Sequence, residues 1–243
     1  MRTIKEENIS QLKKSIVPFQ IFKNPLAYNL QKIPLGPLKK AFPNATFPLA
    51  GLHEFFYKEV EDRAATSGFI GHIIASLMQR GGASVWIGTD LSVFPQAFQR
   101  FGITPDKIIF IPLKKENHIL WAVEEALKCE GLSAVIGELS ELSFIASRRL
   151  QLAIEQSRVT GFILLKNTRA LNTTACVTRW RINQIQTLKT DSTGVGFACW
   201  NVELLKVRNG NPGQWQIEYV AGELRELPPA IKIILHDLQR KTG

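Results

Sequence analysis

The feature that most constrains the fold is an alternation of short apolar runs with segments of helical periodicity. Continuous apolar runs of buried-strand type lie at residues 84–88, 107–113, 133–139 and 160–167. A further short strand is predicted at 51–57. The segments between these strands carry apolar residues at every third or fourth position, as a helix with one buried face requires. This alternation predicts a parallel sheet that is covered by helices on both faces.

The alternation stops after residue 167. Three strand-like segments follow without helices between them, at 178–188, 197–207 and 214–220. The last two are separated by RNGNPG (208–213), which is typical of a hairpin turn. The sequence therefore predicts antiparallel strands added near the C-terminus to a mostly parallel sheet.

Three regions are expected along the chain. Residues 1–48 form a basic arm whose six prolines allow at most a short helix near its start. Residues 49–222 form the core domain, and residues 223–243 form a tail that contains an amphipathic helix. The apolar face of that helix either docks on its own sheet or binds a partner's groove. It carries Ile231, Ile234, Leu235 and Leu238.

The net charge of +9 and the pI near 9.6 favour acidic partners, although a basic protein without such partners has the same composition. No run approaches the ~20 apolar residues of a membrane span, and the N-terminus has no apolar signal region. The three cysteines are scattered, as in a reducing compartment. Neither the cysteines nor the four histidines show metal-ligand spacing. We therefore expect a cytoplasmic protein without a bound metal.

The order of these segments resembles the core of the RecA-type ATPases. Several segments more closely resemble the ImuA family of DNA-damage-inducible mutagenesis proteins, and they occur in the family's order between about residue 48 and residue 220. These segments are GLHEF (51–55), ILWAVEEALKC (119–129), AVIGEL (134–139), ASRRLQLAIEQS (146–157), TRWRI (178–182) and VELLKVRNGNPGQWQIEY (202–219).

This resemblance implies a RecA-like three-layer α/β fold and an accessory role in error-prone DNA repair, which is translesion synthesis within the SOS response to DNA damage. It implies protein partners: an ImuB-type protein, itself similar to a Y-family polymerase, a specialised replicative-type polymerase, and RecA. Residues 86–139 also resemble SulA, an inhibitor of the division protein FtsZ. A SulA-like role is therefore the alternative, although SulA-like chains are shorter and lack the long C-terminal hairpin region.

The turn after the first strand does not have the chemistry of a phosphate-binding loop. Such a loop needs glycines at both ends, a Lys for the phosphate charge and a Ser or Thr for Mg²⁺. The corresponding positions are Ala65, Thr66 and Ser67, and no glycine occurs between residues 52 and 67. Asp62 is better suited to cap the following helix. We therefore expect no nucleotide cofactor and no ATPase activity.

Two carboxylates remain near positions where such ATPases hold a metal ion or activate water. Glu138 ends one predicted strand, and Asp90 follows another. The pair can hold Mg²⁺, which would make the chain a divergent ATPase. Alternatively, each caps a turn or pairs with Arg148 or Arg149.

A polar segment at 166–181 is the candidate contact for single-stranded DNA. In the RecA fold the corresponding connection meets the DNA strand, and this segment carries Lys166, Arg169, Arg179 and Arg181. Trp180 is expected either to stack on a base or, as a strand residue, to pack into the core.

Overall fold

The computed structural model describes residues 33–79, 81–89, 95–166, 172–185 and 198–227. Its strands are β1 (Leu52–Tyr57), β2 (Ala83–Gly88), β3 (Ile108–Pro112), β4 (Leu132–Leu139), β5 (Thr160–Lys166), β6 (Thr178–Ile185), β7 (Ala198–Val207), β8 (Gly213–Val220) and β9 (Glu223–Glu226).

These nine strands form one sheet in the order β3-β2-β4-β5-β1-β6-β7-β8-β9. The six strands from β3 to β6 are parallel, and β7, β8 and β9 continue the sheet in antiparallel pairing. The mixed sheet predicted from the sequence is confirmed, with the antiparallel strands at the expected end of the chain.

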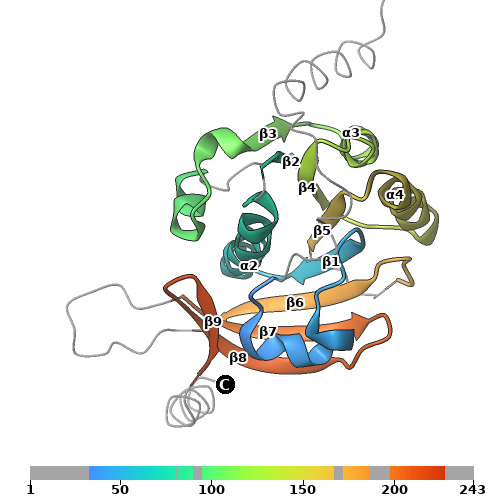
Figure 1. Cartoon of the computed structure of the whole chain (residues 1–243). Helices are drawn as coiled ribbons and strands as arrows, with labels where there is room; N and C mark the ends of the chain where they lie inside the picture. The colour runs from blue at the N-terminus through green and yellow to red at the C-terminus, as the bar shows by residue number, and fades with distance from the viewer. Residues whose placement is uncertain (1–32, 80, 90–94, 167–171, 186–197, 228–243) are drawn as a thin grey trace, which may run out of the picture.

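Three helices cover the sheet: α2 (Val60–Met78), α3 (Glu116–Leu127) and α4 (Phe144–Ser157). Figure 1 shows α3 and α4 together on one side of the parallel strands and α2 on the other. Short 3-10 helices complete the described elements: η3 (Gly36–Ala41), η4 (Pro43–Ala45), η5 (Pro95–Phe101) and η6 (Pro105–Lys107). The three-layer α/β arrangement is consistent with the RecA-like fold that the sequence predicts.

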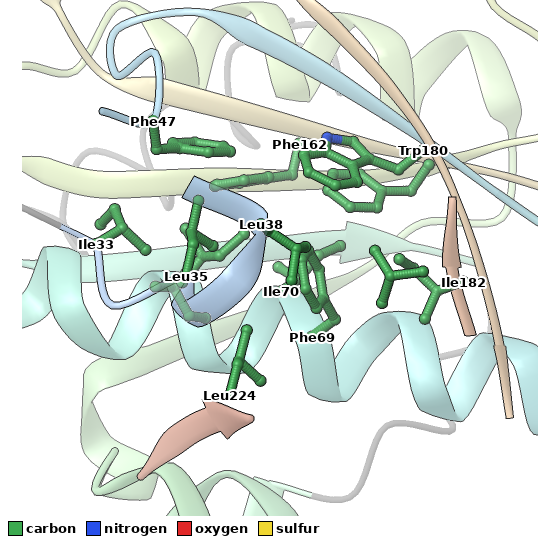
Figure 2. Packing of buried hydrophobic residues seen from close by; sticks show 14 of the residues in the cluster. Ile33, Leu35, Leu38, Phe47, Phe69, Ile70, Phe162, Trp180, Ile182 and Leu224 are labelled. Carbon is green, nitrogen blue, oxygen red and sulfur yellow. The ribbon is translucent and has the colours of Figure 1, made fainter. Parts of the chain in front are cut away.

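The first hydrophobic core lies between the sheet and α2 and is rich in aromatic rings. Trp180 of β6 is fully buried there and stacks on Phe55 of β1, with ring centroids 6.0 Å apart. Figure 2 shows Phe69 and Ile70 of α2 packed in this core with Leu38 of η3. Of the two expectations for Trp180, packing in the core is therefore correct.

The second core lies beneath α3 and α4 and consists almost entirely of aliphatic side chains. Leu150 and Ile154 of α4 and Val123 of α3 are fully buried against it. Because β2, β4 and β5 are covered on both faces, their sequences are almost continuously apolar rather than alternating.

Residues on both sides of the expected core domain (49–222) pack against it. Within the expected arm, Leu35 and Leu38 belong to the first core. Gly36 has φ +52°, and a Cβ built on it would lie 2.0 Å from the Leu224 carbonyl oxygen of β9. Since β9 itself lies past residue 222, the packed body begins before residue 49 and ends after residue 222.

Candidate functional site

The carboxyl edge of the parallel strands is where open α/β sheets bind their ligands. Here only Lys58 and Glu59 separate β1 from α2. Glu59 is the N-cap of the helix, and its backbone N–H donates to Oδ2 of Asp62 (3.4 Å). The expectation that Asp62 is the N-cap is wrong, because the helix begins earlier and places Asp62 at its third position. A two-residue connection leaves no backbone loop to surround a phosphate.

The positions that correspond to the Gly, Lys and Ser/Thr of a phosphate-binding loop lie inside α2 rather than at its start. Ala65, Thr66 and Ser67 are buried in the second turn of the helix. The Thr66 and Ser67 hydroxyls have no hydrogen-bond partner within the part of the chain that the structure describes. Because these hydroxyls are enclosed by protein, they do not reach the edge where a Mg²⁺–phosphate complex would sit.

Glu138 of β4 is held by two side chains from neighbouring elements. Nη2 of Arg63, in the first turns of α2, lies 2.7 Å from Glu138 Oε2 and forms a largely buried ion pair with it. The indole N–H of Trp86, on β2, donates to Oε1 (2.7 Å). Both carboxylate oxygens therefore have partners within the protein, and the guanidinium neutralises the charge that would attract a metal ion. Neither Arg148 nor Arg149 pairs with Glu138, since they lie beside Glu155 and Glu124.

Tyr57 ends β1 beside this ion pair. Burial raises the pKa of its phenol, the Glu138 carboxylate raises it further, and the Arg63 guanidinium opposes the rise. The phenol is therefore neutral at physiological pH and cannot act there as a base. Asp90, the second predicted carboxylate, lies outside the described residues. Among the residues that are described, no three His, Cys, Asp or Glu side chains gather in a metal-binding group.

Arg63 is the residue of this edge that sequence analysis did not connect to Glu138. The two residues are 75 positions apart and belong to a helix and a strand that are not adjacent in the chain. The available signal was a lone arginine in the acidic first turn after one strand and a carboxylate next to the end of another strand.

The predicted DNA-contact residues are not gathered on one surface. Lys166 is exposed at the end of β5, and Arg169 lies outside the described residues. Nε of Arg179 lies 2.5 Å from Oε1 of Glu54, which is fully buried on β1. Arg181 pairs with Glu203 of β7 (3.1 Å) and remains partly exposed. The Arg179 guanidinium is therefore used within the core and is not presented to a phosphate.

Residues 174–177 of the predicted DNA-contact segment are packed against the body, whereas Lys166, Asn172 and Thr173 are exposed. Thr174 donates to Glu54 (2.8 Å), and Lys206 of β7 donates to the Thr174 carbonyl oxygen (3.1 Å). The Ala175 backbone N–H donates to the Ser147 hydroxyl of α4 (2.9 Å), and Cys176 belongs to the second core. Residues 174–177 thus serve as packing between α4 and the β1–β6 pair.

Most of the net positive charge of the chain belongs to residues outside the described ranges. The described residues include 18 Lys and Arg and 16 Asp and Glu, so seven of the nine net positive charges belong to segments outside them. Ile231, Ile234, Leu235 and Leu238, proposed as a partner-binding face, also lie outside the described residues. No helix in the described ranges is long and apolar enough to cross a membrane.

Comparison with known proteins identifies two related sequences and no matching family model. The Protein ImuA sequences of two Caulobacter vibrioides strains, NA1000 / CB15N and ATCC 19089 / CB 15, are each 31% identical to this chain over 190 residues. The aligned region covers 73% of this chain and 78% of each relative.

Proposed function

The chain belongs to the ImuA family, and from this premise we propose that it is a non-catalytic accessory protein of error-prone DNA repair. It acts in translesion synthesis by binding an ImuB-type polymerase-like protein, together with a specialised polymerase, and it binds RecA as a further partner. It provides a RecA-like binding surface for these partners and does not catalyse a reaction.

The observation that supports a non-catalytic role is the pairing of Glu138 with Arg63 and Trp86 at the carboxyl edge of the sheet. A metal ion at Glu138 would have to displace the guanidinium and leave it without its carboxylate in a mostly buried position, which is costly. A nucleotide would further need α2 to unwind at its start, since the helix begins two residues after β1. Both changes oppose the binding of Mg²⁺–ATP.

The experiment that tests the partner role uses this chain and an ImuB-type protein. The two purified proteins are titrated by isothermal calorimetry, with and without Mg²⁺–ATP. We expect a stoichiometric complex with micromolar or tighter affinity, and the same affinity in both conditions because the nucleotide has no site on this chain. Failure to form a complex at tens of micromolar protein would refute the proposed role.

RecA and FtsZ are titrated in parallel with the same preparation. Binding to RecA is the expected result for the second partner. Inhibition of FtsZ assembly without any ImuB-type complex would instead support the SulA-like alternative.

A further inference from the structure

The outward side of α4 exposes apolar side chains that the fold does not use. Of the large hydrophobic side chains that are exposed among the described residues, three lie on this helix: Phe144 (54% exposed), Ile145 (74%) and Leu152 (45%). Figure 1 shows α4 on the outside of the molecule, beside α3 and away from the antiparallel strands. Water-facing groups of this size on one short helix are typical of a binding surface.

The exposed groups do not result from poor packing of α4. Leu150 and Ile154 on its inner side are fully buried. The Ser143 side chain accepts a hydrogen bond from the Ala146 backbone N–H at the start of the helix, and Arg158 closes its end in the left-handed conformation. The helix is therefore well defined at both ends. Because Ile145 and Leu152 are two turns apart, they project from the same side of it.

Arginine side chains accompany this apolar stripe. Arg148 lies between Ile145 and Leu152 along the helix, and its guanidinium is 3.6 Å from Glu155 with half of its side chain exposed. A surface ion pair of this length contributes little and is easily exchanged for another carboxylate. Arg158, at the end of the helix, is exposed and makes no ion pair with any described residue. Apolar side chains with arginine are the composition that protein interfaces favour.

We propose that this surface, the α4 patch of Phe144, Ile145, Arg148 and Leu152, is where the ImuB-type partner docks, which rests on the partner role proposed above. The occupant is an acidic amphipathic helix of that partner. Its apolar side chains cover Ile145 and Leu152, and its carboxylates replace Glu155 at Arg148.

A second copy of this chain does not fit the same patch. In a two-fold pairing of antiparallel α4 helices, Ile145 of one copy would face Leu152 of the other. The midpoint between them falls at Arg148 and Arg149, so like charges would meet at the centre of the interface. Such a contact opposes self-association. A partner that brings a carboxylate to Arg148 in place of Glu155 avoids this contact.

The test compares the binding of the purified ImuB-type protein to the full chain and to variants of it. Ile145→Ser with Leu152→Ser removes the apolar stripe, and Arg148→Glu reverses its charge. Val60→Ser, at an exposed apolar position on α2 (77% exposed), and Lys114→Glu, an exposed lysine outside α4, are the matched controls. We expect each patch variant to weaken binding at least about tenfold, whereas the controls leave it unchanged. Arg148→Glu should also reduce the salt dependence of binding.

The outcomes distinguish a failure of the α4 patch from a failure of the partner role on which it rests. Absence of a wild-type complex overturns both. A wild-type complex that every patch variant retains overturns the α4 patch alone. If the Ile145→Ser, Leu152→Ser variant loses self-association instead, a second copy is the occupant. If that variant melts at a lower temperature, a segment of the chain itself covers the patch. Either of these last two results also overturns the proposal.

Discussion

The contribution of a buried ion pair to the stability of the fold can be tested directly at Arg179, which pairs with Glu54. Its guanidinium contacts Glu54 Oε1 (2.5 Å) and the Asn172 carbonyl oxygen (2.5 Å). It also lies 5.5 Å from the centre of the Phe56 ring. Arg179→Met keeps most of the side-chain volume but leaves the Glu54 carboxylate buried without a cation. Removing one partner of such a pair typically costs about 3–5 kcal/mol, a large fraction of the ~5–15 kcal/mol by which a domain is stable.

Two further variants test whether the unpaired Glu54 carboxylate causes the loss of stability in Arg179→Met. Arg181→Met removes the other arginine of β6, whose side chain is 42% exposed and pairs with Glu203 at the surface. That change should cost less than about 1 kcal/mol. Glu54→Leu combined with Arg179→Met replaces both charges with apolar groups. It should recover most of the stability lost in Arg179→Met, because no buried charge then remains unpaired.

The assay is urea unfolding followed by far-ultraviolet circular dichroism, with melting temperatures as a second measure. Arg179→Met should lower the melting temperature by about 6–20 °C, and Arg181→Met by only a few degrees. Equal stability of the two single variants would refute the assignment of Arg179 to the core. That result would return Arg179 to the surface residues available for DNA.

Three further predictions concern Gly36, His53 and Cys176. Gly36→Ala would place a Cβ against the Leu224 carbonyl oxygen at a positive φ. It should lower the urea midpoint by the equivalent of about 1–3 kcal/mol, more than the control Gly102→Ala, whose Cβ would meet nothing within 4 Å. Burial lowers the pKa of His53 from 6.5 to about 3, so the folded protein binds this proton more weakly than the unfolded chain. Its contribution to stability is complete above about pH 6.5 and is lost as the pH falls toward 3, by about 2–3 kcal/mol at pH 4.5. His53→Asn should flatten that part of the urea-stability profile, and an unchanged acid slope would contradict the assignment. Burial raises the pKa of the Cys176 thiol to about 12, so a thiol reagent at pH 8 should label it only after unfolding, whereas half-buried Cys129 reacts in the native protein.

The main elements of the fold follow from the sequence because their signals are local. The parallel strands β2, β3, β4 and β5 are largely continuous apolar runs, and β8 alternates Trp215, Ile217 and Tyr219 with polar residues, as a half-exposed strand does. The RNGNPG segment lies between β7 and β8, where the hairpin was predicted. The β9 strand was not predicted, because its four residues, Glu-Leu-Arg-Glu, have no strand pattern without the partner β8.

The candidate site could be predicted only in part, because the residues that pair with each other there are distant in the chain. The loss of phosphate-loop chemistry is visible in the residues themselves. The pairing of Glu138 with Arg63 requires the strand order that places β4 near the start of α2, and sequence spacing does not supply it. Arg179 and Arg181 look equivalent in the sequence. Their alternation across β6 directs both to one face of the sheet, but only Arg179 lies opposite Glu54, which is buried on β1.

The pairing of Glu138 with Arg63 and Trp86 at the carboxyl edge of the sheet supports our proposal that the protein acts by binding partners and not by using ATP. The most direct measurement is a titration of labelled ATP with Mg²⁺ against the purified chain, with Glu138→Gln as a second sample. We expect no saturable binding up to millimolar ATP in either sample. Saturable binding in the micromolar range, weakened by Glu138→Gln, would contradict it and identify the chain as a divergent nucleotide-binding protein.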